Sequence, residues 1–255
     1  MQRYETKYGV LYNCDYNEVI NDIQDNSVDL LLTDPPYGIS KEIKITRGRN
    51  GMKFMVSSDI SLYFGKWDDF ENFDDCMNFT YRWLDAVNRV IREGGMFVTF
   101  FDKDKINFIS RYLQEKYNYK LKGYFAYIKT NPVPQARKVK WMNAWECAVL
   151  LQKQGGKLTY NYQLGQQADY IQLPSCGGKE RTAHPTQKPL KLIELFIKYW
   201  TNEGDVVFDP FAGSGTTAVA CIKLDRRYIA IEKDEKYYEI VKNRIEEYSS
   251  QAMLF

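Results

Sequence analysis

The chain has 255 residues and a mass of 30.0 kDa, which suits one large domain or two small ones. Its hydrophobic content of 44% and aromatic content of 15% are those of a globular protein and exclude a disordered chain. The single histidine, His184, excludes an HExxH metalloprotease and a multi-histidine metal centre, and we predict no bound metal.

Charge and cysteine content exclude little more. Lysine and arginine total 35 against 33 aspartates and glutamates, so the net charge favours neither presence nor absence of a polyanionic partner. The cysteines at positions 14, 76, 147, 176 and 221 are too far apart to form a CxxC pair. No apolar run approaches the roughly 18 residues that span a bilayer. We expect a cytoplasmic protein with no membrane contact.

Short apolar runs alternate with amphipathic segments, which indicates βα units in a doubly wound α/β domain covering residues 1–255. Strands are predicted at 28–33, 96–101, 206–208 and 228–231. Helices are predicted at 74–92, 104–115, 190–199, 216–224 and 235–248.

The first of these strands leads directly into Asp34-Pro35-Pro36-Tyr37. The prolines lack N–H groups and cannot extend the ladder, so a backbone carbonyl there can point away from the sheet. Asp34 and that carbonyl form two acceptors beside the flat ring of Tyr37, a set that fits the exocyclic amino group of a planar base. A proline-rich turn with a surface tyrosine is the alternative.

Two stretches, 38–67 and 131–183, interrupt the alternation and are interpreted as inserted loops. Both are rich in basic residues, and the second also contains Trp141 and Trp145. Basic side chains near aromatic rings are typical of a nucleic-acid surface, and a solvated charged loop is the alternative. The candidate contacts are Lys41, Lys44, Arg47, Arg49, Lys129, Arg137, Lys138 and Lys140.

The strand at 206–208 ends in a glycine-containing turn that continues into a helix. Gly213 and Gly215 allow the backbone to approach a ligand at a helix N-terminus. Glu232 follows the next strand, where an acid commonly binds ribose hydroxyls, so the pattern predicts an adenosine-containing cofactor. No lysine follows the second glycine, which argues against a P-loop. The same glycines also fit a nicotinamide-dependent oxidoreductase, a competing interpretation.

Together these motifs resemble those of the β group of amino-methylating DNA methyltransferases, which use S-adenosylmethionine. Asp34-Pro35-Pro36-Tyr37 looks like the catalytic motif of that family, and residues 209–217 look like its cofactor motif. The segment His184-Pro185-Thr186-Gln187-Lys188-Pro189 resembles the part that closes the methionine end of the cofactor site. Tyr127 stands where many relatives have tryptophan, so either a role beside the base or a place in the core is open for it.

The resemblance implies a class I methyltransferase fold, circularly permuted, with a mostly parallel seven-stranded sheet. It also implies that Asn13-Cys14-Asp15 contacts the cofactor adenine. The catalytic residues are expected to be Asp34, Pro35, Pro36 and Tyr37. The cofactor-binding residues are expected to be Cys14, Asp15, Thr186, Lys188, Asp209, Phe211, Ala212, Gly213, Ser214, Gly215, Thr216, Glu232 and Lys233.

The expected reaction is methylation of adenine N6 in double-stranded DNA by a flipped-base mechanism, in a restriction-modification or orphan enzyme. Adenine is preferred over cytosine N4 because relatives that act on cytosine more often begin the tetrad with serine. A catalytically silent DNA-binding relative is a further alternative. Either a monomer or a homodimer is compatible with the sequence. The C-terminal Gln251-Ala252-Met253-Leu254-Phe255 resembles a sliding-clamp-binding peptide, and a tail packed on its own domain is the alternative.

Overall fold

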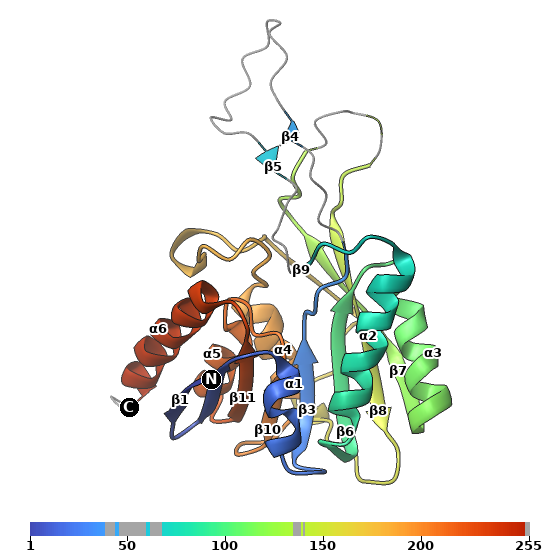
Figure 1. The fold of residues 1–255 in the computed structure, drawn as a ribbon, viewed down its shortest axis with the longest axis vertical. Helices are drawn as coiled ribbons and strands as arrows, with labels where there is room; N and C mark the ends of the chain where they lie inside the picture. Colours follow the sequence, from blue (N-terminus) through green and yellow to red (C-terminus); the bar gives the residue numbers. More distant parts are fainter. Residues whose placement is uncertain (39–43, 46–59, 62–67, 135–138, 140, 253–255) are drawn as a thin grey trace, which may run out of the picture.

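The computed structural model describes residues 1–38, 44–45, 60–61, 68–134, 139 and 141–252. At its centre is a nine-stranded sheet with the strand order β1-β2-β11-β10-β3-β6-β8-β7-β9 (Figure 1). A separate two-stranded sheet pairs β4 with β5. The strands are β1 Gln2–Thr6, β2 Gly9–Asn13, β3 Val28–Thr33, β4 Lys44–Ile45, β5 Ile60–Ser61, β6 Ile91–Phe101, β7 Tyr119–Lys129, β8 Trp145–Lys153, β9 Tyr170–Leu173, β10 Val206–Asp209 and β11 Arg227–Glu232.

Helices cover both faces of the large sheet (Figure 1). Side chains of α1, α2 and α3 belong to one hydrophobic cluster, and side chains of α4, α5 and α6 belong to the other. This two-layer covering confirms the doubly wound α/β fold. The helices are α1 Tyr16–Val19, α2 Phe73–Asn88, α3 Ile106–Tyr117, α4 Leu190–Trp200, α5 Thr216–Lys223 and α6 Glu235–Ala252.

The middle of the sheet is parallel. β11 pairs in parallel with β2 and β10, and β3 pairs in parallel with β10 and β6. From β3 the chain goes on to α2, on one face, whereas from β10 it goes on to α5, on the other. The carboxyl ends of β3 and β10 therefore form a topological switch point, where open α/β sheets bind their ligands.

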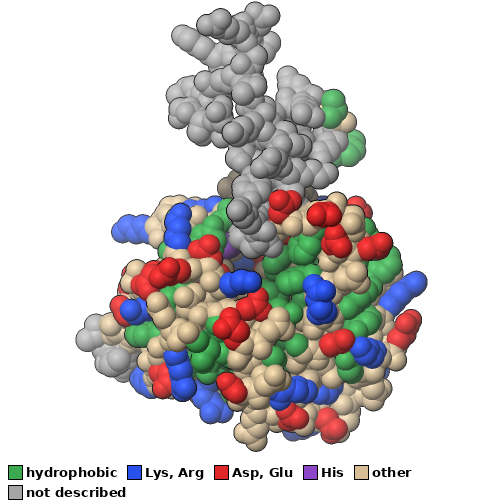
Figure 2. Space-filling view, viewed as in Figure 1, with side chains coloured by type: hydrophobic (Ala, Val, Ile, Leu, Met, Phe, Trp, Pro, Cys, Tyr) green, Lys and Arg blue, Asp and Glu red, His purple; other side chains and the backbone are tan. Residues whose placement is uncertain are grey.

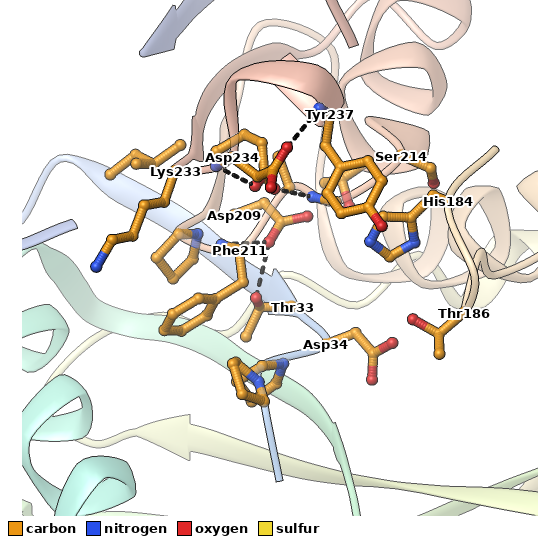
Figure 3. A pocket seen from close by; sticks show the side chains of 18 of the residues that line it. Thr33, Asp34, His184, Thr186, Asp209, Phe211, Ser214, Lys233, Asp234 and Tyr237 are labelled. Carbon is orange, nitrogen blue, oxygen red and sulfur yellow. Dashed lines mark hydrogen bonds between the residues drawn. The ribbon is translucent and has the colours of Figure 1, made fainter. Parts of the chain in front are cut away.

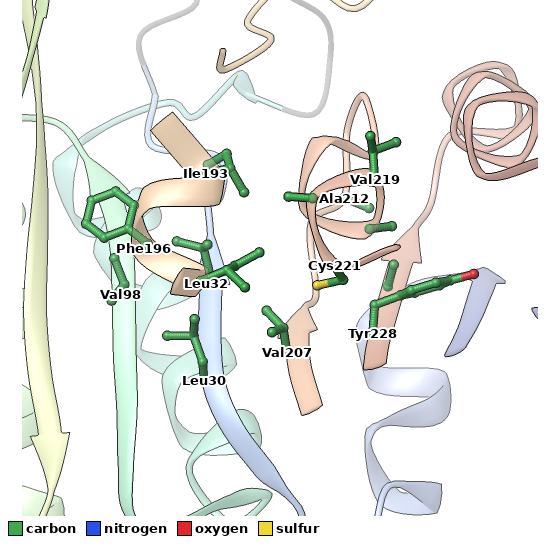
Figure 4. Packing of buried hydrophobic residues seen from close by; sticks show 14 of the residues in the cluster. Leu30, Leu32, Val98, Ile193, Phe196, Val207, Ala212, Val219, Cys221 and Tyr228 are labelled. Carbon is green, nitrogen blue, oxygen red and sulfur yellow. The ribbon is translucent and has the colours of Figure 1, made fainter. Parts of the chain in front are cut away.

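Apolar side chains from distant parts of the chain form the core under α4 and α5. Leu30 and Leu32 of β3 lie beside Val207 of β10, Phe196 of α4 and Cys221 of α5 (Figure 4). On the opposite face Trp83 is fully buried and stacks on Phe97, with ring centroids 5.9 Å apart. The switch-point strands are thus packed on both faces, which gives the site a rigid base.

The structure differs from the sequence prediction at several strands. The sheet has nine strands rather than seven, because β1 and β9 add to its two edges. The stretch 131–183, interpreted as a loop, contains β8 and β9. β6 also begins at Ile91, earlier than predicted. Ile91 pairs with Val28 of β3, and after the charged and glycine-rich run 92–95 the pairing resumes at Met96 and Leu30 with a shifted register. The run 92–95 and the four-residue β9 give little apolar signal in sequence, whereas β8 contains the buried apolar run 147–151, which the prediction of a loop did not take into account.

Candidate active site

A cavity of about 780 Å³ opens at the switch point (Figure 3). Its volume lies within the range of about 300–1,000 Å³ that is usual for small-molecule sites. The structure brings together all of the predicted catalytic residues and all of the predicted cofactor residues except Gly215. The lining includes Cys14, Asp15, Asp34, Pro35, Pro36, Tyr37, Thr186, Lys188, Asp209, Phe211, Ala212, Gly213, Ser214, Thr216, Glu232 and Lys233.

Asp34 follows the last residue of β3 and extends into this cavity (Figure 3). Its Oδ2 pairs with Nζ of Lys188, whereas its Oδ1 is enclosed and accepts no hydrogen bond from any residue that the structure describes. Burial raises the pKa of Asp34, and the Lys188 ammonium opposes this rise. One carboxylate oxygen is therefore anchored, and the other is an unused acceptor inside the cavity.

The turn after Asp34 is held by two side chains from elsewhere in the sequence. Oδ1 of Asp68 accepts hydrogen bonds from the backbone N–H groups of Tyr37 and Gly38, at 2.8 and 2.7 Å. Nζ of Lys105 donates to the carbonyl oxygen of Tyr37 at 2.5 Å. The ring of Tyr37 packs on Phe101 with centroids 5.3 Å apart. These contacts fix the backbone of the tetrad, and its sequence alone did not indicate them.

Two further charged groups extend from Asp34 across the sheet. Lys188 Nζ lies 3.1 Å from Oε2 of Glu146, and Oε1 of Glu146 lies 2.5 Å from Nζ of Lys129. Burial favours a higher pKa for Glu146, but the Lys188 and Lys129 ammonium groups outweigh it and lower the pKa to about 2. The sequence analysis did not identify Glu146, since an isolated acid at the start of a strand has no motif.

The predicted cofactor turn begins at Asp209, the last residue of β10. Asp209 is buried, and its Oδ1 accepts hydrogen bonds from the Thr33 hydroxyl at 2.7 Å and from Phe211 N at 3.1 Å. Burial raises the pKa of Asp209 to about 6. The hydroxyls of Ser214 and Thr216 lie 3.0 Å apart and are both buried. The turn is therefore fastened from inside the protein, while Ser214 and Thr216 still line the cavity.

Gly213 and Gly215 adopt positive φ angles of +54° and +74°. A Cβ at Gly213 would lie 3.0 Å from Nε2 of His184, and a Cβ at Gly215 would lie 2.6 Å from Cγ1 of Val241. Both positions thus require glycine for conformation, and Gly215 also requires it for close packing. Gly215 acts on the cavity through the shape of the turn, since it does not line it.

Glu232 meets this turn from the end of β11. Its Oε2 accepts from Gly213 N at 2.7 Å, and its Oε1 accepts from Asp234 N at 2.9 Å (Figure 3). Burial raises the pKa of Glu232 to about 7. Glu232 lines the cavity, and each of its carboxylate oxygens has a second lone pair, which is what its predicted contact with ribose hydroxyls needs.

The other end of the cavity is formed by the segment around Cys14 and Asp15. Asp15 caps α1, with Oδ1 accepting from Asn17 N at 3.1 Å, and its Oδ2 lies 2.9 Å from Nζ of Lys233. Tyr16 packs edge-on against Phe211 with centroids 5.6 Å apart. A carboxylate beside aromatic rings is a set of groups that suits an adenine ring with its amino substituent.

The segment 184–188, which precedes α4, forms another wall of the cavity. The Gln187 side chain holds this segment, because its Oε1 accepts from Thr182 N at 2.8 Å and its Nε2 donates to Glu180 O at 2.8 Å. His184 packs edge-on against Tyr237, 4.5 Å between centroids, and burial lowers the pKa of His184 to about 4. Thr186 faces Asp34 across the cavity (Figure 3). Lys188, predicted to bind the cofactor, lines the same cavity but contacts Asp34.

Tyr127, for which two roles were open, is a core residue. It is 1% exposed, its hydroxyl donates to Pro174 O at 3.0 Å, and it is not among the residues that line the cavity.

The residues predicted to contact DNA are only partly described. Lys41, Arg47, Arg49, Arg137, Lys138 and Lys140 lie outside the described residues, and Lys44 lies in β4 with its backbone alone described. Lys129 is ion-paired with Glu146, and its side chain is 21% exposed. Beyond the end of β7, Trp141 is 94% exposed, and Lys103 Nζ lies 4.3 Å from the ring centroid of Trp145. On the face of the molecule shown in Figure 2, acidic and basic side chains are interspersed.

The structure bears in part on three further points: a metal site, a membrane-spanning helix and the clamp-like C-terminal peptide. Within the described ranges no group of three or more His, Cys, Asp or Glu side chains could hold a metal ion. Among those residues no helix has the length and apolar character needed to cross a bilayer. Gln251 lies near the end of α6, and residues 253–255 of the clamp-like peptide lie outside the described part, so that prediction stays open.

Comparison with known families gives a match over most of the chain. The family described as DNA methylase, of the N6/N4 type, matches residues 28–243. The type II methyltransferase M2.MboI of Moraxella bovis is 31% identical over 250 residues, covering 93% of this chain and 87% of the relative. The type II methyltransferase M.HinfI of Haemophilus influenzae is 32% identical over 245 residues, covering 90% of this chain and 66% of the relative.

Solved structures give the same result. The M1.HpyAVI–SAM complex aligns with a TM-score of 0.68 at 27% identity, covering 92% of this chain and 98% of that one. The cytosine-N4-specific PvuII methyltransferase aligns with a TM-score of 0.74 at 18% identity, covering 98% of this chain and 94% of that one, and shows the common fold.

The cavity itself fits S-adenosylmethionine. Its carboxylates at Asp15 and Glu232 suit amino and hydroxyl groups, and the glycine turn offers a close backbone approach. The match over residues 28–243, on a chain whose motifs meet in one such cavity, shows that the protein belongs to the N6/N4 family of DNA methylases, the S-adenosylmethionine-dependent DNA amino-methyltransferases.

Proposed function

We propose that this protein methylates N6 of adenine in double-stranded DNA, as the modification enzyme of a type II restriction-modification system. The observation that carries the proposal is the enclosed Oδ1 of Asp34, an acceptor without a partner among the described residues, in the same cavity as the glycine turn. The names of the type II relatives support the biological setting.

The catalytic task is to make a conjugated amino group nucleophilic. S-adenosylmethionine, when bound, supplies an electrophilic methyl group on a sulfonium. Asp34 Oδ1 accepts one N–H of the target amino group, and the carbonyl oxygen of Pro35 or Pro36 accepts the other, which favours a pyramidal nitrogen. As this nitrogen gains the methyl group it becomes positive, and the Asp34 carboxylate stabilises that charge. The nitrogen then releases a proton, which Oδ1 is placed to accept.

Access to this acceptor requires that the base leave the duplex. A base within the helix cannot reach Asp34 inside the cavity, so the target is flipped out at a cost of a few kcal/mol. The ring of Tyr37 lines the cavity next to Asp34, where stacking on the base returns about 1–3 kcal/mol. Because Phe101 and the Asp68 carboxylate hold Tyr37, the stacking surface is in place before the base arrives.

The cofactor residues divide along the cavity. Glu232 accepts hydrogen bonds from the ribose hydroxyls, and Asp15, beside Phe211 and Tyr16, accepts from the adenine amino group of the cofactor. The turn at Gly213 and the segment at Thr186 would hold the methionine portion at the end of the cavity that Asp34 also lines.

The choice of adenine rests on the tetrad, which begins with aspartate in this chain. Cytosine also offers an amino group next to a ring nitrogen, and the same pair of acceptors serves either base. The deciding experiment transfers tritiated methyl groups from S-adenosylmethionine to DNA and separates the nucleosides after digestion. N6-methyladenine is the expected product. N4-methylcytosine would replace the adenine assignment, and no labelled DNA would remove the proposed reaction.

A matched variant connects the product to the site. Asp34→Asn keeps the shape of the side chain but loses its charge, so it should lower methyl transfer by about 100-fold or more while S-adenosylmethionine still binds. Methylation near the wild-type rate in Asp34→Asn would contradict the assignment of Asp34.

A further inference from the structure

Four charged side chains form an alternating row along the edge of the sheet where β3 and β7 end and β8 begins. The row runs from Asp34 to Lys188, then to Glu146 at 3.1 Å, then to Lys129 at 2.5 Å. Asp34 follows β3, Glu146 and Lys129 belong to β8 and β7, and Lys188 precedes α4. The Lys188 side chain is 7% exposed, and its ammonium lies 4.9 Å from the ring centroid of Phe100 on β6.

Burial of an ammonium group removes it from water and destabilises the fold unless nearby carboxylates compensate its charge. Lys188 has two carboxylates within ion-pair distance, so its charge is compensated, and it stays protonated. Burial works against that charged form, but Asp34 and Glu146 outweigh it and keep the pKa of Lys188 well above its ordinary value. Glu146 is in turn ionised and fixed by Lys129.

The consequence for Asp34 is geometric as well as electrostatic. Lys188 occupies Oδ2, so only Oδ1 remains to receive a substrate hydrogen. A neutral carboxylic acid would place a proton on one of these oxygens and would be a poorer acceptor for an amino group. An ammonium at Oδ2 disfavours that state before methyl transfer and fixes the rotation of the carboxylate.

We propose that Lys188, held in place by Glu146 and Lys129, is a positioning residue for methyl transfer that keeps Asp34 ionised and leaves Oδ1 directed at the target amino group. This role differs from the cofactor contact that the sequence resemblance implied for Lys188. It rests on the proposed function of Asp34 as the acceptor of the amino hydrogen.

Other charged groups also face Asp34. Asp68 and Glu146 both raise the pKa of Asp34, Asp209 is coupled to it through space, and Tyr37 is a neutral phenol whose own pKa burial holds well above its ordinary value. Asp68, Asp209 and Tyr37 are unchanged in the variants below, so their effects are common to every measurement.

The test compares pH profiles of two variants for which the proposal predicts opposite shifts. Lys188→Met removes the ammonium, so Asp34 remains protonated to higher pH and the acidic limb of the rate profile moves upward, by about one pH unit or more. Glu146→Gln removes a carboxylate that raises the pKa of Asp34, so the acidic limb moves downward. Lys188→Arg keeps the charge and should keep the wild-type profile.

Rates are measured in single turnover with saturating S-adenosylmethionine and DNA between pH 5.5 and 8.5, so that changes in ligand affinity do not enter. S-adenosylmethionine affinity is measured separately by calorimetry and should change less than about threefold in Lys188→Met, since its role is at Asp34. Lys191→Met, an exposed lysine on α4, is the matched control and should leave both quantities unchanged.

Several outcomes would overturn the inference. Loss of S-adenosylmethionine affinity in Lys188→Met with an unshifted profile would make Lys188 a cofactor residue. Shifts of the same sign in Lys188→Met and Glu146→Gln, or no shift in Glu146→Gln, would contradict the proposed effect on Asp34. If Lys188→Met does not fold, Glu146→Gln and Lys188→Arg still decide the question. An active Asp34→Asn variant would instead remove the proposed function on which the inference rests.

Discussion

The hydroxyl of Thr33 donates a hydrogen bond to Oδ1 of Asp209 at 2.7 Å, which joins two strand ends that lie 176 residues apart in the chain. Thr33 ends β3, directly before the proposed catalytic tetrad, and Asp209 ends β10, at the start of the predicted cofactor turn. Because the same Asp209 oxygen accepts from Phe211 N, one carboxylate fixes the relative position of both motifs.

Removing this bond should destabilise the protein. Thr33→Val keeps the side-chain shape but leaves the buried Asp209 with one partner fewer, so the free energy of unfolding should fall by about 1–3 kcal/mol. Urea unfolding measures it. Thr99→Val is the control, because the Thr99 hydroxyl is also buried but donates to a backbone carbonyl and not to a carboxylate. Equal losses in the two variants would show that the carboxylate has no special role.

The binding of S-adenosylmethionine should depend on pH through Glu232. Only the ionised carboxylate can accept two ribose hydrogen bonds, and burial raises the pKa of Glu232 to about 7. The affinity should therefore weaken as the pH falls below 7, by at most about tenfold per unit. Calorimetry from pH 5.5 to 8.5 measures this. Glu232→Gln should bind more weakly at pH 8 and lose this dependence, and an unchanged dependence would assign it to another group.

The same raised pKa has the opposite effect on the stability of the cofactor-free protein. The pKa of Glu232 is 4.5 in the absence of burial and about 7 in the fold, so the protonated form is the one that the fold favours. This contribution to stability is complete below pH 4.5 and is lost as the pH rises through 7. Urea unfolding of wild type and Glu232→Gln should therefore show a loss of stability over this range only where Glu232 is present.

The turn that follows Asp34 should depend on Asp68. Asp68→Asn keeps a single acceptor for two backbone N–H groups but loses the charge, so Tyr37 is held less firmly. Methyl transfer should fall by about 10- to 100-fold with little change in S-adenosylmethionine affinity, because small displacements of reacting groups have effects of this size. Asp69→Asn, on the exposed neighbouring residue, is the control. Equal rates in the two variants would exclude a role for the Asp68 charge in the turn.

Trp141 offers a test of the predicted DNA surface. Its side chain is 94% exposed in the segment that leads into β8, whose residue Glu146 pairs with Lys188. Trp141→Ala should weaken DNA binding by about tenfold, as expected for loss of one stacking contact, and leave S-adenosylmethionine binding unchanged. Tyr162→Ala removes an exposed aromatic ring near the carboxyl end of α4, away from the cavity, and should leave both unchanged. Wild-type DNA affinity in Trp141→Ala would exclude this contact.

Two motifs and the α/β fold class were predictable from the sequence because they are local. The tetrad at Asp34 and the glycine turn at Gly213 each combine a strand end with residues of restricted or special backbone geometry. The residues of each motif follow one another in the chain, so the motif can be read without knowledge of the fold. The strands predicted at 28–33 and 206–208 were recognisable from their apolar runs, since both are buried on two faces.

The tertiary structure alone decided how those motifs work together. Glu146, Asp68 and Lys105 have no signal in sequence, because each acts on a residue that another strand or loop places beside it. Lys188 was recognised as part of a motif, but its contact with Asp34 depends on the packing of the segment before α4 over β3. Local chemistry is determined by neighbours in the chain, whereas the pairing of buried charges is determined by which strand ends meet at the switch point.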